Sequence, residues 1–197
     1  MIAAYHLIWS AYGWWLPNDP RGSGSQTIRE DILTELGELH LGRKKIQPAG
    51  REIRAFYARA KDLLYHELST FMDAEISLLA ECFANTVSKH RYTCYACAIM
   101  PDHVHLAIRK HRHWAEEMIE HFQDESRPAL QAARGKPVHP IWGGPGWKVF
   151  LATEDDVRRT IAYVENNPIK AGRRAQRWPF VTVYDGWLPG GRMRRKG

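Results

Sequence analysis

Apolar residues recur along the chain with two different periods, which predicts strands interleaved with helices. Short runs rich in β-branched and aromatic residues predict strands, and apolar residues spaced by three and four predict helices. The Pro101-Asp102 turn joins two strands into a hairpin, and the helix capped by Thr153 should end before Pro168, because the residue ahead of a proline avoids the α region. The predicted strands are 3–10, 92–100, 103–109, 147–151 and 180–184, and the predicted helices are 73–90, 114–133 and 154–167.

This order of elements predicts an α+β fold, a sandwich in which helices pack on a mixed or antiparallel sheet. Residues 13–68 combine turn residues with two charged stretches, 28–45 and 51–68, which we expect to be surface helices. We therefore expect one domain over residues 1–185, with 13–68 as an insertion laid over the core, and a flexible basic tail at 186–197.

The composition is that of an ordinary globular protein. Hydrophobic residues make up 44% and charged residues 25% of the 197 residues, which excludes a disordered or fibrous chain. The sequence contains no run of about 18 uncharged apolar residues, so no membrane span is expected. Three cysteines, and a start that lacks the basic region of a signal peptide, predict a protein of the reducing cytoplasm.

Positive charge is concentrated at the C-terminal end of the chain. The net charge is +6, yet residues 168–197 alone carry eight basic residues against one acidic residue. A nearly neutral body with a basic end is typical of a domain that meets a polyanion such as DNA. A merely solubilising tail is the alternative.

Two histidines in one predicted strand are candidate metal ligands. Because side chains alternate along a strand, His103 and His105 project from the same face, while Val104 faces the core. Two imidazoles side by side suit a divalent cation, although two unrelated surface histidines would give the same spacing. The similar pair His111 and His113 lies at a strand end and is interpreted as a solvated face.

Tyr163 is a candidate nucleophile. On the helix that follows Thr153, Tyr163 points about 120° away from the apolar stripe, at 100° per residue, and toward polar neighbours such as Arg159. An amphipathic tyrosine at the edge of the core is the competing interpretation. Together with the histidines, the tyrosine suggests attack on a phosphodiester beside a metal ion. Asn167, or Asn166 in its place, would add an oxygen ligand, and such a mixed set suits Mg²⁺ or Mn²⁺.

Two strings carry a family resemblance. Met100-Pro-Asp-His-Val-His-Leu106, followed far downstream by Ala162-Tyr-Val-Glu-Asn-Asn-Pro-Ile-Lys-Ala-Gly172, resembles the single-tyrosine HUH transposases, in particular the REP-associated tyrosine transposases. The resemblance runs from about residue 70 to 185. The opening Ser10-Ala-Tyr-Gly-Trp-Trp-Leu-Pro-Asn-Asp-Pro-Arg-Gly22 is similar to the N-terminal segment of one branch of that family.

The resemblance implies a ferredoxin-like fold with the histidine pair on a central strand and the tyrosine on a neighbouring helix. It implies a transposase that nicks and joins single-stranded DNA, on a hairpin or repetitive sequence, through a 5′-phosphotyrosine. His103 and His105 become metal ligands, Tyr163 the nucleophile, and Asn167 stands where compact relatives usually have glutamine. The 13–68 segment is longer than in those relatives, which leaves open a monomer or a homodimer, and use of Tyr163 in its own or its partner's site.

Further residues are candidates for DNA contact, with a solvated face as the alternative for each charged one. Aromatic rings near glycine-rich loops can stack on bases, and arginines and lysines can grip phosphates. By contrast, we expect Cys94 and Cys97 to be buried hydrophobes on opposite faces of a strand, without redox chemistry. The candidate DNA-binding residues are Trp142, Trp147, Arg159, Lys170, Arg173, Arg174, Arg177, Arg192, Arg194 and Arg195.

Two other functions remain open at this point. A non-catalytic or domesticated DNA-binding protein could use the same scaffold. A zinc hydrolase built on the His-x-His pair would need further histidine or aspartate ligands that converge from distant positions.

Overall fold

The computed structural model describes residues 1–25, 27–28, 30–42 and 44–190. Its centre is a four-stranded antiparallel sheet with the strand order β2-β3-β1-β4. With their helices these strands follow the β-α-β-β-α-β order of a ferredoxin-like fold, so the predicted α+β class is confirmed. No helix among the described residues is long and apolar enough to cross a bilayer. The elements are β1 (Ala4–Ser10), η1 (Asp31–Leu36), α1 (Gly50–Leu63), α2 (Asp73–His90), β2 (Cys94–Ile99), β3 (His103–Arg109), α3 (Ala115–Arg134), β4 (Trp147–Leu151) and α4 (Glu154–Lys170).

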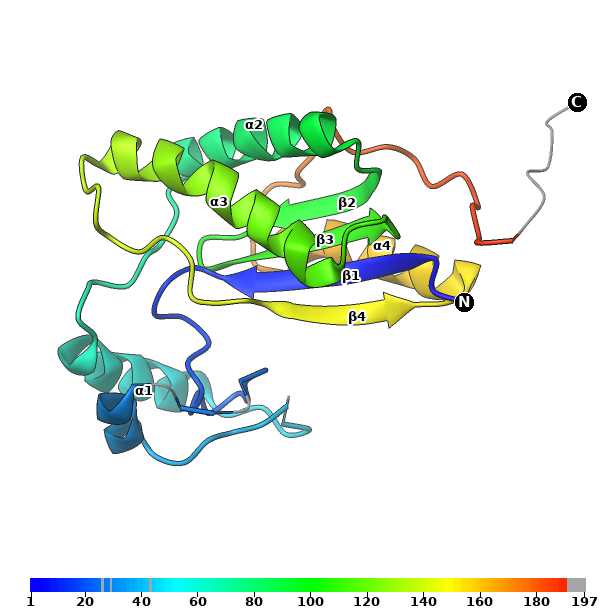
Figure 1. Ribbon diagram of the computed structural model, residues 1–197. Coiled ribbons are helices and arrows are strands. Elements are labelled where there is room, and N and C mark those ends of the chain that lie inside the picture. Colours follow the sequence, from blue (N-terminus) through cyan, green and yellow to red (C-terminus); the bar gives the residue numbers. More distant parts are fainter. Residues whose placement is uncertain (26, 29, 43, 191–197) are drawn as a thin grey trace, which may run out of the picture.

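Helices cover both faces of the sheet. Helices α2 and α3 lie on one face, and α4 lies on the other (Figure 1). The α2/α3 face is built from large side chains such as Leu7, Trp9 and Leu106. The α4 face is built from small ones, among them Ala98 and Ala107. Small side chains leave room for the helix backbone, so α4 packs close to β2 and β3.

The segment between β1 and α2 has a small apolar core of its own and lies beside one end of the sheet (Figure 1). Its second charged stretch forms α1, as predicted. The prediction of a helix over 28–45 is wrong, because the described residues of this stretch form a single short 3-10 helix, η1. Gly37 and Gly42 have φ angles of 115° and 76°, which an α-helix cannot accommodate, and Gly37 ends η1.

Helix α4 continues past the end that its proline predicts. Pro168 lies inside the helix and its ring is buried. A proline this close to the end removes only one helical hydrogen bond, the one to the Val164 carbonyl, and the next turn still closes from the Ala171 amide to the Asn167 carbonyl at 3.2 Å. Tyr163 and Asn167 therefore lie one turn apart on one regular helix.

The predicted strand at 180–184 is also wrong. Residues 176–182 run along the edge of β2 but form only one bridge, between Val181 and Cys94. The Gln176 side chain takes the place of a strand by donating to the Ile99 carbonyl at 2.7 Å and accepting from the Ile99 amide at 2.8 Å. A side-chain amide thus satisfies the edge that a fifth strand would have paired.

The two cysteines of β2 share a face, against the expectation from their spacing. A register shift between Cys94 and Ala96 inserts one extra residue, so Cys94 pairs with Ile108 and Cys97 with Leu106 on the same side of the sheet. Both cysteines are free thiols buried in the core, and burial raises the pKa of each. They behave as small apolar side chains, as predicted.

The close approach of α4 to the sheet gives a first prediction. Ala107→Leu should lower the free energy of unfolding by about 1–3 kcal/mol, because a larger side chain has no space under the helix. Urea unfolding measures the change. Ala133→Leu, on the exposed side of α3, is the matched control and should stay within about 0.5 kcal/mol of the parent. Equal stability of the two variants would contradict tight packing beneath α4.

Candidate active site

The paired histidines of β3 point to the α4 side of the sheet. They alternate with Val104 and Leu106, which lie in the opposite core. The two rings are 4.8 Å apart between centroids and perpendicular to each other. His105 is only 6% exposed, whereas His103, at the start of the strand, is half-buried. The predicted shared face is thus observed.

His103 is oriented by its neighbour in the turn. Its Nδ1 lies 2.7 Å from Oδ1 of Asp102. Burial raises the pKa of Asp102, but the hydrogen bond from His103 and the nearby Arg21 guanidinium outweigh it and hold that pKa below its usual value. Asp102 is therefore a carboxylate that accepts the Nδ1 proton, and in the neutral form of the His103 ring the lone pair then lies on Nε2.

His105 is oriented by a histidine that sequence reasoning missed. Nε2 of His6, on β1, lies 3.0 Å from Nδ1 of His105. Burial lowers the pKa of His6 to about 4, and burial together with the neighbouring histidines lowers that of His105 well below the ordinary value. Both rings are neutral at pH 7, so one donates and the other accepts. When His105 donates, its Nε2 is free in the same way as that of His103.

Tyr163 lies directly over these rings. Its ring centroid is 5.4 Å from that of His105 and 5.7 Å from that of His6, with both contacts edge-on. Its side chain is 40% exposed, so a ligand in solvent can reach it. The ammonium of Lys170 lies 5.7 Å from the Tyr163 ring centroid, which places a positive charge beside the phenol. The structure thus brings together the tyrosine and the histidine pair.

Asn167 lies one turn beyond Tyr163 on α4 and is half-buried. Asn166, its substitute in the sequence argument, donates its side-chain amide to the Ala162 carbonyl at 2.7 Å. Asn166 is thereby tied to its own helix, so Asn167 remains the better placed of the two. Its role as a ligand stays a prediction.

One predicted DNA contact is wrong. Trp142 is 7% exposed and packs in the core under α3, where its indole N–H lies 3.1 Å from Oγ of Ser126. A ring that is buried and hydrogen-bonded in this way offers no face to a base. Its position next to a glycine-rich loop suggested exposure, but the loop leaves the core only after Trp142.

Unlike Trp142, Trp147 is exposed on the surface of the sheet. Across the sheet, Trp147 pairs with Ile8, Ile8 with His105 and His105 with Ala98. Paired side chains project from the same face, so Trp147 shares the face of His105, two strands or about 10 Å away. It is 48% exposed because α4 packs mainly on β2 and β3 and leaves the Trp147 end of β4 open.

The predicted basic contacts are spread over several environments. Arg159 faces solvent and pairs with Asp156 at 2.7 Å. Arg173 pairs with Asp73 at the start of α2, and Arg174 and Arg177 are exposed. Of these residues and Lys170, only the lysine contacts Tyr163. Arg192, Arg194 and Arg195 lie outside the described residues.

The inserted segment contributes a second group that sequence reasoning missed. The Arg21 guanidinium lies 3.8 Å above the Trp15 ring and is held by two hydrogen bonds to buried Asp19. Trp15 in turn lies edge-on to His103, with 6.3 Å between the centroids. The backbone of Trp15 has a positive φ of 55°, and its amide donates to the Tyr57 hydroxyl at 2.8 Å. A cation on an aromatic ring therefore borders the histidine pair.

Comparison with known proteins gives two structural likenesses. No family model and no curated protein matches the chain. One similar solved structure is a REP-associated tyrosine transposase bound to a REP hairpin, with a TM-score of 0.46 and 11% identity over 86% of this chain and 68% of that chain. Another, from Deinococcus radiodurans R1 and provisionally named a transposase, has a TM-score of 0.37 and 14% identity over 89% of this chain and 94% of that chain.

The first of these structures carries the name of the family that the two sequence strings resemble. Both TM-scores lie below 0.5 and both identities below 25%, so the support for a function comes from the geometry of this chain.

The buried His6 makes stability depend on pH. Between its unfolded pKa of 6.5 and its folded pKa of about 4, the unfolded chain binds a proton that the folded chain excludes, so stability falls as pH falls through this window. We expect His6 to contribute about 3 kcal/mol of this loss. Urea unfolding of the parent and of His6→Phe at several pH values in EDTA measures it. The parent should lose more stability than the variant, and parallel profiles would contradict the assignment.

Proposed function

We propose that this protein is a metal-dependent enzyme that nicks and joins single-stranded DNA, with Tyr163 as the nucleophile and hairpin-forming or repetitive DNA as the substrate. The observation that carries the proposal is the contact of the Tyr163 ring with His105 and His6, on the sheet face that also presents His103. A solvent-accessible phenol beside two oriented imidazoles is the arrangement that attack on a phosphodiester requires.

The proposed cleavage is a transesterification that needs only Tyr163 and the DNA strand as reactants. The Tyr163 oxygen attacks a phosphorus atom and loses its proton to solvent or to a neighbouring base. The bond from phosphorus to the 3′ oxygen breaks, and that oxygen leaves as a free 3′-hydroxyl after taking up a proton. The 5′ phosphate stays bound to Tyr163, and attack by another 3′-hydroxyl reverses these steps and joins the strands. Lys170 would stabilise the negative charge on the phenolate and the phosphate.

The histidine pair fits a divalent cation. Asp102 and His6 occupy Nδ1 of His103 and His105, so both Nε2 atoms are available as ligands, and Asn167 would supply an amide oxygen. Bound there, Mg²⁺ or Mn²⁺ would polarise a non-bridging phosphate oxygen. Imidazole is a softer donor than the oxygen ligands that Mg²⁺ prefers, so we expect Mn²⁺ to be at least as effective.

The surroundings of the site suit a single strand. The half of the sheet face that α4 leaves open presents Trp147, on which a base can stack. On the His103 side, Arg21 on the Trp15 ring offers a positive charge and an aromatic edge to the backbone. Binding should weaken steeply with salt, because phosphate contacts release counterions.

Removal of the phenolic oxygen tests the nucleophile. Tyr163→Phe should abolish the covalent adduct with 5′- and 3′-labelled hairpin DNA while leaving DNA binding within about twofold, because the ring and its contacts remain. Denaturing gels detect the adduct, and the label that stays with the protein gives its polarity. Tyr65→Phe, an exposed tyrosine in the insertion, is the matched control and should react like the parent.

Adduct formation by Tyr163→Phe would show that Tyr163 is not the nucleophile. A parent protein that binds hairpins tightly in Mn²⁺ without any adduct would instead favour the non-catalytic DNA-binding alternative.

The orientation of His103 gives a prediction on the metal. Asp102→Asn should raise the Mn²⁺ concentration for half-maximal adduct formation by about 10–100-fold, because an amide no longer fixes the Nε2-available form of the ring. His103→Ala and His105→Ala should remove both cleavage and its metal dependence. Asp124→Asn, an exposed acid on α3, serves as the control. An unchanged Mn²⁺ requirement in Asp102→Asn would show that the carboxylate does not orient the ligand.

A further inference from the structure

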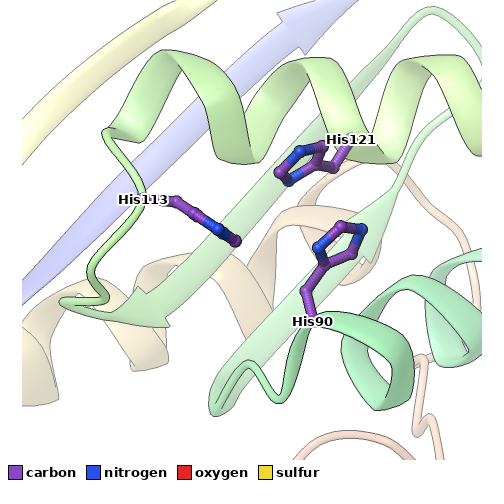
Figure 2. A group of neighbouring side chains, drawn as sticks. All are labelled: His90, His113 and His121. Atoms are coloured by element: carbon purple, nitrogen blue, oxygen red, sulfur yellow. The ribbon is translucent and has the colours of Figure 1, made fainter.

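A second group of histidines converges on the α2/α3 side of the molecule. His90 ends α2, His113 lies in the loop after β3, and His121 lies near the start of α3. One nitrogen from each ring lies within 4.8 Å of the others, and Figure 2 shows the rings gathered around a shared space. All three side chains are half-buried, so the interpretation of His113 as part of a solvated face is wrong.

We propose that His90, His113 and His121 form a separate binding site for a transition-metal ion, with Zn²⁺ as the best match. Three imidazoles are the ligands that Zn²⁺, Cu²⁺ and Ni²⁺ select, whereas Mg²⁺ and Mn²⁺ prefer oxygen. A tetrahedral zinc ion with bonds of about 2.0–2.1 Å holds its ligand nitrogens about 3.3 Å apart. The three nitrogens that lie within 4.8 Å of one another would have to close by about 1.5 Å, which side-chain rotations can supply.

A side chain holds one nitrogen of each ring by a hydrogen bond. The Tyr92 hydroxyl lies 2.9 Å from Nδ1 of His113 and 2.7 Å from Nδ1 of His121. A phenol oxygen can accept both N–H groups, and in that state Nε2 of each ring is free for a metal. Glu125 Oε1 lies 2.8 Å from Nε2 of His90, which leaves Nδ1 of that ring free. Outer partners of this kind accompany ligating histidines in metal sites.

The three rings are packed closely together. The His90 and His121 rings stack at 3.9 Å with planes 11° apart, and the His113 ring lies 5.0 Å from that of His121. A shared ion lies in the plane of each ligating ring, so binding should tilt His90 and His121 away from their stacked arrangement.

This group is distinct from the candidate active site. His103 stands at the start of β3 and faces α4, whereas His113 follows the far end of the strand. His103 and Arg109 are the two ends of β3, six residue steps or about 20 Å apart. An ion at the triad would tie the end of α2, the loop after β3 and α3 together, and its three protein ligands would leave the fourth tetrahedral position to water.

Zinc titration in a background without the active-site ligands tests the proposal. The full-length His103→Ala/His105→Ala protein, stripped with chelator, should bind one Zn²⁺ by calorimetry, and Co²⁺ should give the visible absorption of a tetrahedral site. Zn²⁺ at a hundredfold excess over its Kd should raise the melting temperature by about 5–10 °C. Adding His113→Ala/His121→Ala should abolish all three signals.

Two further variants keep the test decisive if the alanine variants fold poorly. In the same background, Tyr92→Phe keeps the ring but removes the hydroxyl, and should weaken Zn²⁺ binding by about 10–100-fold. His66→Ala, at an exposed histidine outside the triad, should bind like the background. Zn²⁺ binding that is equal in the background, Tyr92→Phe and His113→Ala/His121→Ala proteins would overturn the proposal, as would no binding at all.

The outcome does not depend on the proposed DNA chemistry. A protein with His113→Ala/His121→Ala alone should still form the Mn²⁺-dependent adduct at Tyr163, because the triad lies outside that site. Loss of the adduct in that variant while its fold is intact would show that the two sites are not separate.

Discussion

Helix α4 approaches the sheet closely because the strand residues beneath it are alanines, and the geometry of the candidate site depends on this contact. Ala98 and Ala107 share one small core with Val157 and Val164 of α4. With larger side chains there, the helix would stand further off and carry Tyr163 away from the imidazoles. The same helix packs mainly on β2 and β3, which leaves the Trp147 end of the sheet face open beside the tyrosine. The packing of α4 on these alanines therefore sets both the contact between Tyr163 and the imidazoles and the access of solvent to that contact.

Burial and hydrogen bonding set the protonation of the histidines and of Asp102 in this site. An imidazole removed from water resists protonation, so His6 and His105 stay neutral and share one hydrogen bond. Asp102 keeps its charge because it accepts from His103. Each β3 histidine then has one nitrogen fixed by a partner and one free. This is the arrangement on which the proposal of a cation bound by the other two nitrogens rests.

Local sequence patterns correctly predicted the features of the fold that are set by residues close together in the sequence. The strand at 103–109, the shared face of His103 and His105, and the position of Tyr163 outside the apolar stripe of its helix follow from periods of 2 and 3.6 residues. His6 was missed because its contact depends on the register of β1 against β3, although its alternation with buried Leu7 places it on the right face. The predictions of an exposed Trp142 and of Cys94 and Cys97 on opposite faces of β2 were wrong for the same reason. Burial and strand register are fixed by tertiary packing and not by the local sequence.

The two histidine groups differ from His40 and His139 in that a side chain, and not a backbone carbonyl, holds one nitrogen of each ring. A carboxylate holds His103, a phenol holds two rings of the triad, and Glu125 holds His90, so each ring is fixed with a lone pair directed elsewhere. His139, by contrast, bonds the carbonyl of the adjacent Pro140, an interaction local to its own loop. Sequence spacing alone cannot distinguish candidate ligand histidines from other histidines, because His-x-His occurs at both 103–105 and 111–113. The hydrogen-bond partner of each ring distinguishes them, and that partner is known only from the folded arrangement of the strands and helices.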